Sequence, residues 1–144
     1  MPTPYAHIAV CVDESEGSER ALAEARRLFA PGENRLSIVH VATSGVTFAG
    51  TPDAPLSEIV DAVHSSEAWL ARTAATVEGA EPVLLEGEPS GAVVEWARDA
   101  GVDLLVASSS RGFLERLLLG SFATHLTRHA PCSVLLVRPR DERG

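Results

Sequence analysis

The residues of this sequence that could bind an anion gather in the segment 105–122. The segment begins as a short apolar run, continues through small polar residues, and ends at Gly120-Ser121, where a helix is expected to begin. Backbone N–H groups in the first turn of a helix have no acceptor within the helix, and the helix dipole attracts negative charge there. Hydroxyl and guanidinium donors suited to a phosphate are added by Ser108, Ser109, Ser110, Arg111 and Ser121. A phosphate site is one interpretation and a plain connecting loop is the other, because junctions of this composition are common.

Patterns for catalysis or metal binding are weaker. No Gly-x-Ser-x-Gly sequence, which would present a nucleophilic serine, occurs in the chain. His125 and His129 have the spacing of two metal ligands on one helix, but no glutamate follows His125 and no third ligand is apparent. We expect both to be structural or surface histidines. His40 and His64 also lack an identifiable nucleophile or ligand partner, so we expect neither an enzyme nor a dedicated metal site.

Hydrophobic periodicity predicts five strands and four helices. Continuous apolar runs predict fully buried strands at residues 7–13, 36–41, 81–87, 103–107 and 132–137. Apolar residues at helical spacing predict helices between successive strands, at residues 21–29, 59–77, 90–100 and 122–129. Ser90 is expected to cap the third helix, and Gly101 is expected to end it.

Strands that alternate with helices predict an α/β fold. The simplest arrangement is a doubly wound parallel sheet of five strands in the order 3-2-1-4-5, with helices on both faces. In such sheets a ligand binds at the C-terminal ends of the strands where the winding reverses. With this order the reversal falls between the first and fourth strands, which end at Asp13 and at the segment 107–112. Local chemistry and topology therefore select the same place.

Composition indicates one soluble globular domain over residues 1–144. Charged residues make up 22% and hydrophobic residues 45% of the chain, which excludes gross disorder. The net charge of -8 argues against nucleic acid as a partner, and no apolar run approaches the ~20 residues of a membrane span. The N-terminus lacks the basic start and apolar core of a signal peptide. Cys11 and Cys132 lie far apart in apolar runs and are expected to be free, buried thiols, so we expect a cytoplasmic protein.

Several stretches together resemble the universal stress protein family over nearly the whole length. Residues 10–22 resemble the family's opening strand and turn, His40-Val41 the end of its second strand, and residues 87–106 its third helix and fourth strand. The most specific match joins Leu117-Leu118-Leu119-Gly120-Ser121 to His129-Ala130-Pro131-Cys132-Ser133-Val134. The resemblance implies a Rossmann-like fold and a regulatory function.

Nucleotide-binding members of that family share a Gly-x2-Gly-x9-Gly-(Ser/Thr) loop, which is degenerate here. Gly120-Ser121 is kept, but the first two glycines fall either on Ala107 and Ser110 or on Ser109 and Gly112. Glu14 also stands in place of the glycine usual after the first acidic residue. A Cβ at a loop glycine crowds the nucleotide, or costs ~1 kcal/mol or more where a left-handed backbone is needed. Alanine and serine are the smallest possible replacements.

The resemblance implies a regulatory module that binds ATP or another adenine nucleotide. Asp13 and Val41 would flank the base and ribose. The phosphates would be wrapped by Ala107, Ser108, Ser109, Ser110, Arg111 and Gly112, and held after Gly120 by the amides of Ser121 and Phe122. A magnesium ion would come with the nucleotide, since the chain offers no dedicated carboxylate cluster. At most a slow hydrolysis of ATP is implied, with no identifiable general base.

The alternative is a stress-response dimer that does not bind nucleotide and acts through protein contacts, because the family also contains members whose loop has lost its glycines. The strand Val134–Val137 is the expected dimer edge, since it is apolar and ends the sheet.

Overall fold

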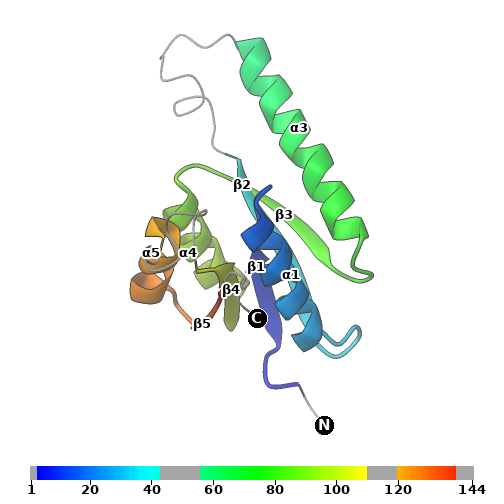
Figure 1. Ribbon diagram of the computed structural model, residues 1–144, viewed down its shortest axis with the longest axis vertical. Coiled ribbons are helices and arrows are strands. Elements are labelled where there is room, and N and C mark those ends of the chain that lie inside the picture. Colours follow the sequence, from blue (N-terminus) through cyan, green and yellow to red (C-terminus); the bar gives the residue numbers. More distant parts are fainter. Residues whose placement is uncertain (1–2, 43–55, 110–119, 139–144) are drawn as a thin grey trace, which may run out of the picture.

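The computed structural model describes residues 3–42, 56–109 and 120–138, apart from the side chains of residues 57–59. Its centre is a five-stranded sheet in the order β3-β2-β1-β4-β5, and every adjacent pair is parallel (Figure 1). The strands are β1 (His7–Cys11), β2 (Arg35–Ala42), β3 (Glu81–Glu86), β4 (Leu104–Ser108) and β5 (Ser133–Val137). The predicted order 3-2-1-4-5 is confirmed.

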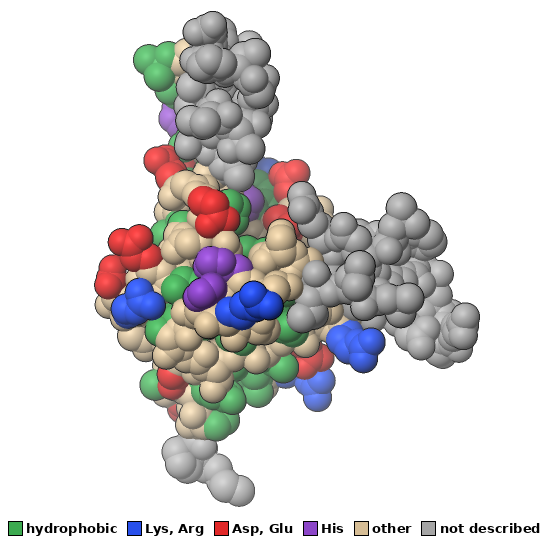
Figure 2. Space-filling view, turned by 90° about the vertical axis from the view of Figure 1, so that its left-hand side faces the viewer, with side chains coloured by type: hydrophobic (Ala, Val, Ile, Leu, Met, Phe, Trp, Pro, Cys, Tyr) green, Lys and Arg blue, Asp and Glu red, His purple; other side chains and the backbone are tan. Residues whose placement is uncertain are grey.

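Helices cover both faces of the sheet. On one face lie α1 (Glu16–Leu28) and α3 (Leu56–Ala75), and on the other lie α4 (Pro89–Ala100) and α5 (Ser121–His129). Figure 2 shows the molecule from the side on which α4 and α5 lie. None of the described helices is both long enough and apolar enough to cross a lipid bilayer.

The apolar run of β1 after His7 follows from this double cover. Ile8 and Val10 pack with α1 and α3, whereas Ala9, on the opposite side of the strand, packs with α4 and α5. All three side chains are inaccessible to solvent. A parallel strand covered on both faces needs apolar residues at every position rather than at alternate ones.

The predicted cap of α4 is wrong by two residues. Glu88, not Ser90, is the N-cap, and its carboxylate accepts hydrogen bonds from the Ser90 N–H at 3.2 Å and the Gly91 N–H at 2.7 Å. Pro89 occupies the first turn, where its fixed φ suits the helix and its missing N–H costs nothing. Ser90 therefore lies inside the helix. The predicted end at Gly101 is confirmed by its left-handed φ of 71°.

A buried histidine lies at the start of β1. The His7 side chain is 4% exposed, its Nε2 lies 2.8 Å from Ser37 Oγ, and its ring meets Trp96 edge-on at 6.1 Å. Its Nδ1 has no hydrogen-bond partner among the described residues. Burial, and secondarily the charge of Arg35, lower the pKa of His7 below its ordinary value of 6.5. The folded protein therefore holds this ring neutral.

Acidification below pH 6.5 is expected to destabilise the protein through His7. Just below pH 6.5 the unfolded chain binds a proton at this residue, whereas the folded chain does not. The contribution of His7 to the free energy of unfolding is therefore complete above pH 6.5 and is lost as the pH falls toward the folded pKa. The loss approaches about 1.4 kcal/mol per pH unit within this window. Urea unfolding at pH 7.5 and 5.5 measures it.

His7→Gln should be less stable than the wild type at pH 7.5 but should lack this pH dependence, whereas His64→Gln, at an exposed position, should keep it. Equal pH dependence in wild type and His7→Gln would contradict the assignment.

Candidate functional site

The winding of the sheet reverses between β1 and β4, and the candidate site lies where these strands end. Ser108 is the last residue of β4, and the buried Ser109 continues the pairing by donating its N–H to the Val137 carbonyl at 3.0 Å. The first turn of α1 packs against this end of β4, because a Cβ added to Gly17 would overlap the side chain of Ser108. Glycine is therefore the residue that lets α1 approach the strand so closely.

The start of α5 is joined to the same strand end. The Gly120 N–H donates to the Ser109 carbonyl at 3.2 Å, and Gly120 is the N-cap of α5. No side chain caps this helix, and its first internal bond runs from the Thr124 N–H to the Gly120 carbonyl at 2.9 Å. The amides of Ser121 and Phe122 thus precede the helix's own hydrogen-bond ladder. Two helix N-termini, those of α1 and α5, flank Ser108 and Ser109.

Asp13 lies in the turn between β1 and α1. Its Oδ1 accepts hydrogen bonds from the Ser15 N–H and the Ser18 hydroxyl, both at 2.8 Å, and Ser18 Oγ in turn accepts from the Asp13 N–H at 2.7 Å. Burial alone would raise the pKa of Asp13, but these hydrogen bonds and the neighbouring His40 lower it overall. The carboxylate is therefore ionised and stabilises the turn through Oδ1.

Val41 lies at the same edge of the sheet as Asp13. Cys11 pairs with Val39, so Asp13 and Val41 each follow that pair by two residues. The Val41 side chain is half-buried and packs with the cluster under α4 and α5, as does the buried Ala107. The strand ends thus bring together most of the predicted site residues. Ser110, Arg111 and Gly112 lie outside the described residues.

A pocket of about 420 Å³ lies between α1 and α3, on the face of the sheet opposite to α4 and α5. Asp13 is the one predicted site residue in its lining. The others are Val12, Glu14, Ser15, Ser18, Glu19, Leu22, Trp69, Thr73 and Thr76. The sequence analysis did not identify Trp69 and the two threonines, although their spacing of four and three residues is that of one helix face.

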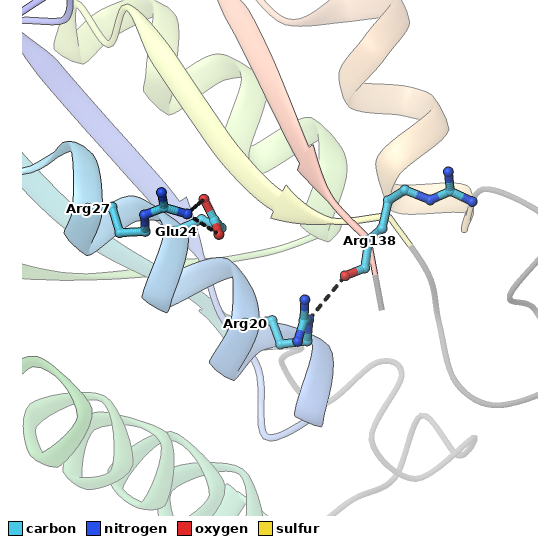
Figure 3. A network of polar contacts seen from close by, with 4 residues as sticks. All are labelled: Arg20, Glu24, Arg27 and Arg138. Atoms are coloured by element: carbon cyan, nitrogen blue, oxygen red, sulfur yellow. Dashed lines mark hydrogen bonds and ion pairs between the residues drawn. The ribbon is translucent and has the colours of Figure 1, made fainter. Parts of the chain in front are cut away.

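The turn that leads into α1 is strongly acidic. Glu14, Glu16 and Glu19 follow Asp13 within six residues, and all three are exposed. The first arginine of α1, Arg20, donates from Nε to the Arg138 carbonyl at 3.1 Å and so ties the end of β5 to the helix (Figure 3). A phosphate beside this turn would meet negative side chains as well as helix dipoles, so an accompanying cation would favour its binding.

A doubly wound parallel sheet with its crevice between β1 and β4 defines a Rossmann-like α/β protein. Residues 4–138 match the sequence model of the universal stress protein family, and the chain belongs to this family. It is 30% identical to universal stress protein YxiE of Bacillus subtilis over 143 residues, which cover 90% of this chain and 96% of the relative.

Solved structures of the same family have the same fold. Universal stress protein UspA from Lactobacillus plantarum is 27% identical, with a TM-score of 0.72 over 93% of this chain and 98% of that one. A universal stress protein in complex with cAMP is 25% identical, with a TM-score of 0.70 over 94% of this chain and 99% of that one.

Proposed function

We propose that this protein is a regulatory module that binds an adenine nucleotide, with ATP as the first candidate, between the C-terminal ends of β1 and β4. The observation that carries the proposal is that the N-termini of α1 and α5 both flank Ser108 and Ser109. The N-terminus of α5, which no side chain caps, attracts phosphate oxygens through its free N–H groups. The N-terminus of α1 is capped by Ser15 and adds the field of its helix dipole. The family relative in complex with cAMP supports an adenine nucleotide as the ligand class.

In this proposal each part of the crevice has one task. The amides of Ser121 and Phe122 hold phosphate oxygens at the start of α5, and the segment from Ala107 to Gly112 surrounds them. Asp13 and Val41 flank the ribose and base. Mg²⁺ arrives with the nucleotide and offsets the acidic turn. We assign no catalytic residue, and we propose that the chain acts as a single cytoplasmic domain that binds without turnover.

Titration calorimetry of the nucleotide-free protein with ATP and Mg²⁺ tests the proposal. We expect saturable binding to the wild type and none to Ser121→Trp, because the indole fills the space in front of the α5 amides. Ser65→Trp is the matched control, since Ser65 is exposed on α3, and it should bind as the wild type does. Absence of heat with millimolar ATP, or equal binding by Ser121→Trp, would refute the site.

A dimeric module that acts through protein contacts is the second candidate. Its support is the edge strand β5, which pairs with β4 on one side only. Val134, Leu135 and Leu136 are half-exposed there, and an apolar edge of this kind favours pairing with another chain. A monomer by light scattering at micromolar concentration would count against this candidate.

A further inference from the structure

In place of the structural or surface role expected from the sequence, we propose that His125 and His129, on the outer surface of α5, chelate a divalent transition-metal ion of the kind that prefers imidazole, such as Zn²⁺. The two residues lie one helical turn apart, where side chains four positions apart are neighbours. Their ring centroids are 4.4 Å apart and the ring planes are inclined by 43°. The folded helix therefore holds the two imidazole rings in contact, and a change of side-chain rotamer would bring one nitrogen of each ring to a shared metal ion.

The pair is accessible to solvent. His125 is half-buried and His129 is exposed, and Figure 2 shows adjacent histidine side chains on this side of the molecule. Within the described ranges, no group of three or more His, Cys, Asp or Glu residues could hold a metal. Two imidazoles would therefore bind the ion, and water would complete its tetrahedral shell. Such a site is exchangeable rather than structural.

The surrounding charge favours a cation. His129 is the last residue of α5, at the negative end of the helix dipole, and His125 lies one turn before it. The pKa of Glu88, whose carboxylate caps α4, is lowered first by the hydrogen bond from the Gly91 amide and also by the nearby His125. An ionised carboxylate thus lies close enough to His125 to interact with its charge. Arg128 opposes the metal, but it is exposed and screened by solvent. Neither histidine belongs to the proposed nucleotide crevice, so this inference does not depend on that proposal.

Zinc titration of tag-free protein, followed by calorimetry, tests the site. We expect one Zn²⁺ per chain and at least about tenfold weaker binding in His125→Ala and in His129→Ala, because each variant removes the intramolecular second bond. His64→Ala, which removes an exposed histidine of α3, should bind as the wild type does. Mg²⁺ should not compete, since it prefers oxygen ligands.

A second measurement follows the wild type alone and so does not depend on the folding of the variants. Side-chain ¹⁵N resonances of His125 and His129 should shift together on addition of Zn²⁺, while that of the buried His7 should not. Zinc binding that is unchanged in both alanine variants would overturn the proposal. So would the absence of binding to the wild type at millimolar Zn²⁺, or shifts confined to other histidines.

Discussion

Replacing Asp103 with alanine is expected to lower the free energy of unfolding by about 2–4 kcal/mol, because two charge-assisted hydrogen bonds are lost. Asp103 Oδ1 accepts from the His7 N–H and Oδ2 from the Ala6 N–H, both at 2.8 Å. The Asp103 N–H donates in return to the His7 carbonyl at 3.0 Å. This reciprocal contact fastens the first strand of the sequence to the start of β4, almost a hundred residues later. Urea unfolding at pH 7.5 measures the effect.

Two further variants separate the carboxylate from the charge alone. Asp103→Asn keeps one acceptor oxygen and places an NH₂ group against the other amide, so its stability should lie between those of wild type and Asp103→Ala. Asp99→Ala removes an acidic residue of α4 that is exposed to solvent, and it should change stability by less than about 0.5 kcal/mol. If Asp103→Ala were no less stable than Asp99→Ala, the hydrogen bonds from Ala6 and His7 to Asp103 would contribute nothing to the free energy of unfolding.

Leu126→Ala is expected to cost about 2–5 kcal/mol, the usual range for truncating a fully buried leucine. Leu126 is inaccessible to solvent and packs α5 onto the sheet beside Ala9, Val93 and Leu105. The cavity left by the mutation also removes the support under the helix whose first turn we assign to the phosphates. Nucleotide affinity should therefore fall together with stability. Denaturant midpoints and calorimetry at a temperature where the variant is folded measure the two effects separately.

Leu126→Met is the matched control, because it nearly conserves volume and should cost less than about 1.5 kcal/mol. An equal loss in both variants would mean that the shape of the side chain, rather than the buried volume, determines the stability of α5. Unchanged nucleotide binding in a folded Leu126→Ala protein would separate the position of α5 from ligand binding.

The architecture could be predicted because short apolar runs determine it. After His7 the run in β1 is apolar at successive positions, as a strand covered on both faces requires. Pro82 lies in the edge strand β3, where a missing N–H is tolerated. Strand ends were predicted less well. The first strand was predicted to reach Asp13, but β1 ends at Cys11, and the Asp13 carboxylate accepts hydrogen bonds from Ser15 and Ser18 in the turn that follows.

The candidate site was predictable only in outline. Strand order gave its position, since that depends on the alternation of strands and helices alone. The cap at Glu88 was missed because a serine is the commoner cap and the carboxylate reaches its amides only when Pro89 begins the helix. The pocket beside Trp69 was missed for another reason. Helical periodicity tells which face of α3 turns inward, but it does not tell how far α3 stands from α1.

The hydrogen bond between Gly120 and Ser109 has a consequence for how the chain can vary. It places Ser109 and Gly120, the two residues that bound the segment 110–119, side by side. The entropic cost of closing a flexible segment rises only with the logarithm of its length, by about 0.6 kcal/mol for each doubling. Insertions and deletions there should therefore leave the folding equilibrium almost unchanged, and ligand preference can diverge between relatives while the scaffold stays the same.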